Sequence, residues 1–311
     1  MLNFIVCGTR CCKNDTALNE KGYSMNGISY HLHLIGYWLR RFYRACRIPM
    51  KLDIHAVEHC NLNCLGCTHF STLAEPEFCD LELLEKSLSR LSHFQKSFDT
   101  VQILGGEPLL NPQLSRMIEM VRAYFNKVRL TLITNGLLLL QPDKLPKDFW
   151  ETCRKNKVVI KLTQYPINLD YDAIERICKQ HGLAFEVFAK RTEAERGWHK
   201  FLLNEKGGNV WAFKYGLFKL MRCRSFNCFQ LVGNRIYPCS HVAYVHHLNK
   251  AFGTRFERRE GDYVEVDRLK CSFQIRKMML FSTPFCFYCG SGYPNVPWSV
   301  SKRNPDEWIV Q

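Results

Sequence analysis

Short apolar runs of strand length recur along the middle of this chain, separated by segments of helical spacing. The runs lie at 51–57, 100–104, 128–134, 158–163 and 183–188. Between the first two, leucines recur every three or four residues, which predicts an amphipathic helix over 81–95. We predict further helices from Asn111, taken as the N-cap before Pro112, to Phe125, around 145–155, and from the cap Asp170 to about Gln180.

Repeated strand–helix units predict a parallel sheet with right-handed crossovers. The expected fold class is therefore α/β, a partial (β/α)6 barrel of the TIM type. Ligand sites of such a sheet lie at the carboxyl ends of its strands. The pattern of residues 191–222 leaves open whether they complete the sixth unit.

Beyond residue 222 the pattern changes to that of a β-hairpin. Phe229 to Val232 and Arg235 to Tyr237 flank Gly233-Asn234, and we expect Asn234 to take the left-handed conformation of the turn. Cysteines surround this hairpin at Cys223, Cys228 and Cys239, and a C-x2-C pair follows at Cys286 and Cys289. Such pairs serve a zinc ribbon or an iron–sulfur cluster.

The composition indicates a globular protein, with 46% apolar and 23% charged residues among 311. Sixteen cysteines would suit disulfides in a secreted protein. Residues 1–12, however, lack the basic start and long apolar core of a secretory signal, and no apolar run reaches the length of a membrane span. We therefore expect a cytoplasmic protein whose thiols are partly committed to metal.

A net charge of +14 favours an anionic partner, unless it serves only solubility. The candidates are a phosphorylated or nucleotide-linked substrate, nucleic acid and an acidic membrane surface. Residues 29–46 mix aromatic side chains with Arg40, Arg41 and Arg44. This segment suits peripheral membrane contact or packing against the barrel, and we favour packing.

Three cysteines directly after the first strand carry the strongest chemical indication. Cys60, Cys64 and Cys67 have the spacing C-x3-C-x2-C. Thiolates this close can converge on one metal centre. A structural zinc site needs four ligands, which His59 or His69 would complete, whereas a cubane cluster held by three cysteines keeps one iron open.

With Gly105-Gly106-Glu107-Pro108 about 40 residues later, behind the second strand, this triad resembles the radical S-adenosylmethionine (SAM) superfamily. The resemblance implies a [4Fe–4S] cluster on the three cysteines and SAM bound at its open iron. Gly105, Gly106 and Pro108 would approach the methionine end of SAM, and Glu107 would meet its ammonium group. By their positions at strand ends, Thr134, Asn135 and Gln164 are further candidate contacts.

One position departs from the family pattern. Relatives usually carry an aromatic residue beside the adenine just before the third cysteine, and this chain has Gly66 there. We expect His69 or Phe70 to take over the stacking.

The second cysteine set resembles the auxiliary-cluster extension called SPASM or, in its one-cluster form, twitch. The family spacing favours Cys223, Cys239, Cys286 and Cys289 as ligands of a second [4Fe–4S] cluster, with Cys228 in reserve. The predicted organisation is an N-terminal extension (1–48), the partial barrel (49–222), a small hairpin–helix iron–sulfur extension (223–290) and a C-terminal tail (291–311). We expect this tail to be exposed, with cover of the auxiliary site by Trp298 and Trp308 as the alternative.

The expected function is reductive cleavage of SAM to a 5′-deoxyadenosyl radical that takes hydrogen from a substrate. A phosphorylated or nucleotide-linked, sugar-like alcohol is favoured, and a peptide or small-molecule substrate of another kind, or a partner glycyl-radical enzyme, is the alternative. A one-electron reductant such as flavodoxin or ferredoxin is implied as a partner. The alternative of another class is a zinc protein that binds nucleic acid, against which the strand–helix alternation and the triad spacing argue.

Overall fold

The computed structural model describes residues 50–190, 202–208, 227–290 and 295–310, with residues 43, 47, 48, 198, 199, 223 and 225 besides. The chain divides into two compact units, 1–45 and 46–311, and the description below concerns the second. The predictions for residues 29–46 and for the segment 209–222 fall outside the described residues, apart from Tyr43. No helix of the part described is long and apolar enough to cross a membrane.

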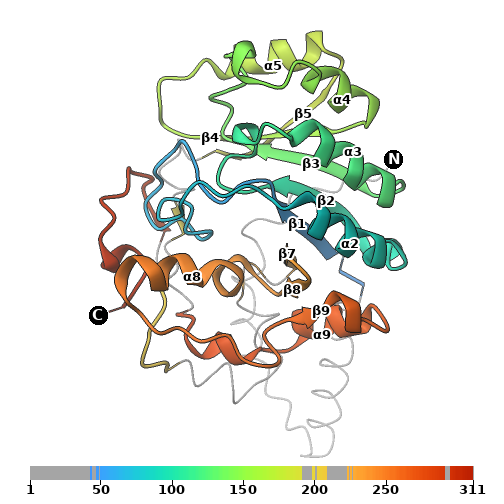
Figure 1. The fold of residues 1–311 in the computed structure, drawn as a ribbon. Coiled ribbons are helices and arrows are strands. Elements are labelled where there is room, and N and C mark those ends of the chain that lie inside the picture. The colour runs from blue at the N-terminus through green and yellow to red at the C-terminus, as the bar shows by residue number, and fades with distance from the viewer. Residues whose placement is uncertain are drawn as a thin grey trace, which may run out of the picture. The chain divides into compact units, whose positions relative to one another are not determined.

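An eight-stranded sheet forms the centre of the unit, in the order β5-β4-β3-β2-β1-β7-β8-β9 (Figure 1). Its strands are β1 (Met50–His55), β2 (Phe98–Leu104), β3 (Arg129–Thr134), β4 (Val159–Gln164), β5 (Ala184–Lys190), β7 (Cys228–Val232), β8 (Arg235–Tyr237) and β9 (Val264–Glu265). Neighbours from β5 to β7 are parallel, whereas β8 and β9 are antiparallel. A separate antiparallel pair joins β6 (Trp198–His199) to β10 (Asn295–Val296). The sheet is open, which confirms the expected partial barrel, while the sixth strand–helix unit falls mostly outside the described residues.

Helices connect the parallel strands as the leucine spacing predicted. They are α2 (Leu81–Ser92), α3 (Leu114–Tyr124), α4 (Phe149–Lys155) and α5 (Tyr171–Gln180), followed by α8 (Ser240–Phe252) and α9 (Phe273–Leu280). Figure 1 shows α2, α3 and α4 on one side of the sheet and α8 on the other. The Asp170 carboxylate caps α5 by accepting the Ala173 amide, as expected.

Two local predictions are wrong. Helix α3 begins at Leu114, because Asn111 donates its side-chain amide to the Ala56 carbonyl and accepts from the Gln113 N–H, which holds it in a turn before the helix. In the hairpin, the left-handed residue is Gly233, with φ of 56°, and the Asn234 side chain instead donates to Asp267.

The two faces of the sheet differ in chemistry. Leu52, Ile54, Val101, Ile103 and Leu132 are buried on one face. Many alternate positions, such as Asp53, Gln102 and Thr131, are polar, and helix α8 covers part of that face through a core that includes Phe70, Tyr244 and Trp308. Trp308 is 1% exposed, so the expectation of an exposed tail is wrong there. Hairpin β7–β8 extends the same sheet, and the division at residue 222 stays a prediction.

Candidate functional site at the carboxyl ends of the strands

The triad lies in the loop that leaves β1 at its carboxyl end. Burial raises the pKa of the Cys60 thiol, and the nearby Glu107, Cys67 and Cys64 add to the increase. Burial also raises the pKa of Cys67, although backbone N–H groups of residues 69–71 donate to its sulfur and act to lower it. The mutual influence of the three thiols places their sulfurs within electrostatic range of one another.

The three thiols are donors of the kind that an iron–sulfur cluster binds. Among the described residues, no group of three or more His, Cys, Asp or Glu side chains is arranged to hold one metal ion. A cluster contains its own sulfides and therefore holds its cysteines farther apart than one ion does. Burial raises the pKa values of Cys60 and Cys67, and bound iron would compensate by stabilising their thiolates.

Gly105 and Gly106 are required because the loop after β2 packs against the loop after β1. A side-chain carbon at Gly106 would overlap the His59 carbonyl and the Cys60 nitrogen, and one at Gly105 would overlap the Val57 carbonyl. Gly106 N donates to Val57 O at 2.9 Å, and Glu107 N donates to His59 O at 3.1 Å. The glycines thus bring the end of β2 against the cysteine loop, while their approach to SAM stays a prediction.

Glu107 ties the ends of β2 and β3 together. Its Oε1 accepts from Thr134 Oγ1 at 2.6 Å and from Leu109 N, and its Oε2 accepts from Asn135 N at 2.9 Å. Burial raises its pKa to about 7, against the lowering effect of these hydrogen bonds. Asn135 Nδ2 in turn donates to Asn61 Oδ1 at 2.8 Å and lies 3.8 Å from Cys60 Sγ. The structure therefore brings Glu107, Thr134 and Asn135 to Cys60.

The remaining candidates around the triad lie as follows. Gly66 has φ of 56°, a conformation that explains glycine where relatives carry an aromatic residue. His69 is partly buried with its ring 5.0 Å from that of His55, and Phe70 packs in the core beside α8. Pro108 begins a buried 3-10 turn, and Gln164 ends β4 at the same edge. Contact of these four side chains with SAM stays a prediction.

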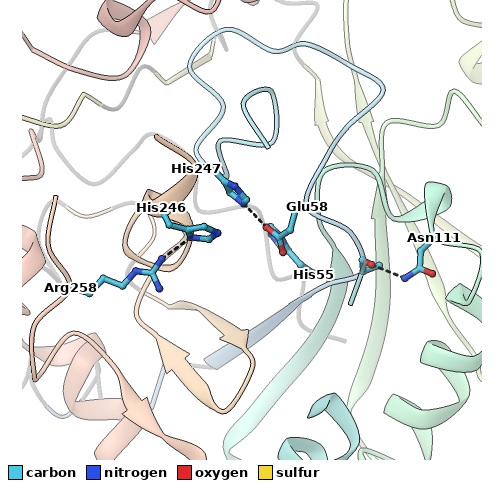
Figure 2. A network of polar contacts seen from close by, with 7 residues as sticks. His55, Glu58, Asn111, His246, His247 and Arg258 are labelled. Atoms are coloured by element: carbon cyan, nitrogen blue, oxygen red, sulfur yellow. Dashed lines mark hydrogen bonds and ion pairs between the residues drawn. The ribbon is translucent and has the colours of Figure 1, made fainter. Parts of the chain in front are cut away.

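A buried acid–imidazole network links the loop after β1 to α8 (Figure 2). Glu58 lies between two histidines, with Oε1 3.4 Å from His55 Nδ1 and Oε2 3.1 Å from His247 Nε2. Burial acts to raise the pKa of Glu58, but His55 and His247 outweigh it and hold that pKa below its ordinary value. His55 also stacks on Tyr244 of α8, with ring centroids 3.8 Å apart. His55 and Glu58 are only three residues apart, but sequence spacing gave no indication that His247, 189 positions from Glu58, would join them.

Four polar residues form a row across the polar face of the sheet. They are Gln230, Asp53, Gln102 and Thr131, which are paired in register on β7, β1, β2 and β3. Each glutamine donates its amide to one Asp53 oxygen at 2.7 Å. Gln102 Oε1, Gln230 Oε1 and Thr131 Oγ1 are buried without a hydrogen-bond partner. From the sequence, residues 51–57 are identified only as an apolar run of strand length, so this row was not predicted.

The second cysteine set lies partly at the opposite end of the sheet. Cys228 pairs in register with Lys51 at the start of β1, and Cys239 follows β8 as it returns to that edge. Burial raises the pKa of Cys228 to about 12, with Asp53, Cys223 and Cys239 adding to it, so these three thiols are near one another. Cys286 lies in the 3-10 turn Pro284–Phe287, and Cys289 bridges to Leu203.

Comparison with known proteins bears on the first cysteine set. Residues 54–187 match the model of the radical SAM superfamily, a stretch that holds the triad, Glu107 and Asn135. These residues form a radical SAM domain. The match confirms the family predicted from the triad and indicates an enzyme, for which the family implies a [4Fe–4S] cluster and SAM.

The match with each relative covers only part of that relative's length. A GTP 3′,8-cyclase of Aliarcobacter butzleri is 34% identical over 100 residues, which are 31% of this chain and 30% of that protein. A GTP 3′,8-cyclase of Helicobacter pylori is 31% identical over 137 residues, 43% of this chain and 38% of the relative. The chain thus spans about a third of the length of these relatives.

Among solved structures, BtrN in complex with AdoMet and 2-DOIA has a TM-score of 0.45 and 15% identity, covering 84% of this chain and 98% of BtrN. Native anSMEcpe with bound AdoMet has a TM-score of 0.45 and 15% identity, covering 75% and 83%.

Proposed function

We propose that this protein is a radical SAM enzyme with Cys60, Cys64 and Cys67 as the ligands of its catalytic cluster. The observation that carries the proposal is the convergence of three strand ends on Cys60, through Glu107 and Asn135. When bound, the cluster and SAM would supply the 5′-deoxyadenosyl radical that removes hydrogen from a substrate. The chain's own residues would fix the cysteines, exclude water by burial and orient SAM at the Gly105–Glu107 turn.

The polar row supports a substrate that carries hydroxyl groups. The Asp53 carboxylate accepts only, so both glutamines must turn their N–H groups toward it and their carbonyl oxygens away. Buried acceptors without partners are costly until they meet a donor. An alcohol O–H supplies that donor, and His55 lies two residues beyond Asp53, on the same face and nearer the triad.

Basic side chains on the same face support an anionic group on that alcohol. Lys51 and Arg129 pair in register with Thr100, one step from the row. Lys161 is close enough to Arg129, Lys51 and Asp53 for their charges to affect its pKa, which burial lowers. With a net charge of +14, and relatives named for GTP, a phosphorylated or nucleotide-linked, sugar-like alcohol is the substrate class we favour.

The second cysteine set is proposed to hold an auxiliary [4Fe–4S] cluster. Cys223, Cys239, Cys286 and Cys289 are its proposed ligands, with Cys228 in reserve. Proximity of Cys223, Cys228 and Cys239 supports one half of this set. A cluster at the amino end of β1 would be separated from the triad by the polar row. A substrate bound at the row would then lie between the two clusters, where the auxiliary cluster could take up an electron from it. The reductant is proposed to be an external one-electron carrier such as flavodoxin or ferredoxin.

Iron and sulfide content tests the proposal most directly. After anaerobic reconstitution, the wild type should hold about eight irons, and the Cys60/Cys64/Cys67 triple alanine variant about four, as two [4Fe–4S] clusters require. The triple variant should no longer form 5′-deoxyadenosine from SAM. Zinc without sulfide in the wild type would refute the radical SAM assignment, and loss of all iron in the variant would refute the second site.

Substitutions of residues in the polar row test the proposed substrate class. Gln102→Leu and Gln230→Leu each remove an amide that faces Asp53, so turnover of the alcohol should fall about tenfold or more, through a raised KM, because each loses a buried hydrogen bond. SAM cleavage without substrate should be unchanged. Ser89→Ala, on the exposed part of α2, is the control. Equal loss of SAM cleavage would mean that the row supports the fold only.

A further inference from the structure

The tail after residue 295 contacts the cysteine loop through its backbone. Leu65 N donates to Ser299 O at 3.0 Å, and Ser301 N donates to Asn63 O at 3.1 Å. These two hydrogen bonds flank an antiparallel bridge between Cys64 and Val300. The middle cysteine of the triad is therefore held between two hydrogen bonds from the tail.

A second contact reaches the third cysteine. Trp308 Nε1 donates to the Cys67 carbonyl at 3.0 Å, and the same carbonyl accepts from Phe70 N at 3.0 Å. The indole is packed in the core beside α8. Its N–H dipole thus points at the peptide group of a proposed cluster ligand, from a fixed position.

Hydrogen bonds within the tail hold its conformation, as expected of a segment that positions another loop. The buried Glu307 carboxylate accepts from Ser301 Oγ at 2.6 Å and from Lys302 N at 2.7 Å, and it forms a capping box with Asn304. Hydrogen bonds to a buried carboxylate are stronger than those between neutral groups. Residues 301–308 therefore present Trp308 as a unit.

The tail is also connected to the second cysteine set. Leu203 N donates to Trp308 O at 2.7 Å, and Val310 N donates to Leu203 O at 2.8 Å. On its other side the same short segment pairs with the C-x2-C stretch, since Asn204 N donates to Tyr288 O at 2.8 Å and Gly290 N to Leu202 O at 2.9 Å. Backbone hydrogen bonds thus lead from the C-x2-C segment through Leu203 to Trp308, and the Trp308 indole N–H completes the connection to Cys67.

We propose that the C-terminal tail positions the catalytic cysteine loop, with Trp308 as a positioning residue that acts through the Cys67 carbonyl, and that Leu203 couples this tail to the auxiliary cysteine segment. The inference rests on the proposed function for the identity of the bound group. The claim that the tail positions the cysteine loop concerns the protein alone and does not depend on a bound cluster. A hydrogen-bond donor aimed at a ligand's peptide group would favour the reduced, more negative state of a bound cluster.

Trp308→Phe tests this because phenylalanine keeps most of the ring and removes only the N–H. Trp298→Phe is the matched control, since it makes the same change in the same tail at an indole N–H that has no hydrogen-bond partner. In the cluster-free protein, hydrogen–deuterium exchange of residues 62–70 should speed about two- to tenfold in Trp308→Phe, the range expected from one lost hydrogen bond. Exchange of residues 203–204 and 288–290 should also increase, whereas Trp298→Phe should match the wild type.

A second measurement separates positioning from general stability. After reconstitution, Trp308→Phe should shift the midpoint potential of the triad's cluster to more negative values and alter its electron paramagnetic resonance signal, with Trp298→Phe unchanged. Unchanged exchange, potential and spectrum in Trp308→Phe would overturn the inference while leaving the proposed function intact. A wild type that binds no iron would refute the proposed function, and the exchange data would still decide whether the tail positions the loop.

Discussion

At the scale of single residues, Glu107 combines burial with three internal hydrogen bonds. Its pKa of about 7 lies above the ordinary value of 4.5 because burial disfavours the charged form. Folding therefore takes up a proton at this carboxyl between those pH values. The stability it contributes is fully present below pH 4.5 and is lost as pH rises through 7.

We expect the free energy of unfolding of the cluster-free protein to fall by up to about 3 kcal/mol over this pH window on account of Glu107. Glu107→Gln should lower stability at acid pH and flatten that part of the profile. Urea denaturation at pH 4.5 to 7.5 measures both. An unchanged slope in the variant would show that other groups cause the pH dependence.

At Gly106, the absence of a side chain allows the loop after β2 to approach the cysteine loop. Gly106→Ala should destabilise the cluster-free protein by several kcal/mol and prevent iron loading, because the added carbon would overlap the backbone of residues 59 and 60. Gly253→Ala is the comparison, since open space surrounds Gly253 and only its left-handed backbone, at φ of 66°, opposes a side chain at about 1 kcal/mol. Equal effects of both changes would contradict the close approach.

At the scale of elements, Glu58 joins the end of β1 to helix α8 through His247, and His55 stacks on the same helix. Glu58→Gln should lower the free energy of unfolding by about 1–3 kcal/mol, because a buried, charge-assisted contact is lost.

Glu75→Gln provides the control, because its partner Lys250 lies on the same helix α8. Glu75 pairs with Lys250 at 2.7 Å, but both side chains are exposed and solvent screens their charges, so the change should leave the free energy of unfolding nearly unchanged. Denaturant titration at neutral pH compares the two variants. A similar, small effect of both would mean that the Glu58 network does not hold α8.

At the scale of the whole molecule, the two cysteine sets divide the proposed chemistry. Cys286→Ala should leave uncoupled SAM cleavage intact and stop substrate turnover, because the triad would bind its own cluster without Cys286. Cys271→Ala, at an exposed cysteine just before α9, is the control and should retain both activities. The measurements are 5′-deoxyadenosine and product formation. Normal turnover in Cys286→Ala would make the C-x2-C segment purely structural.

The sequence by itself determined the local elements and the chemistry of the first site. Leucine spacing in α2 and the Asp170 cap of α5 specify structure within a few residues of themselves. The triad and the Gly-Gly-Glu-Pro turn each follow a strand, and parallel strands place their carboxyl ends at one edge. Boundaries shifted where a side chain bonded elsewhere, as Asn111 does to Ala56.

Only the tertiary structure decided which distant segments meet. The pairing of β7 with β1, the row through Asp53 and the contact of Trp308 with Cys67 join residues separated by 49 to 241 positions. Local periodicity records that a segment is buried on one face, but the partner and the register depend on packing of the complete chain. For the same physical reason, the sequence indicated the cysteine loop, whereas folding alone placed the tail that holds it.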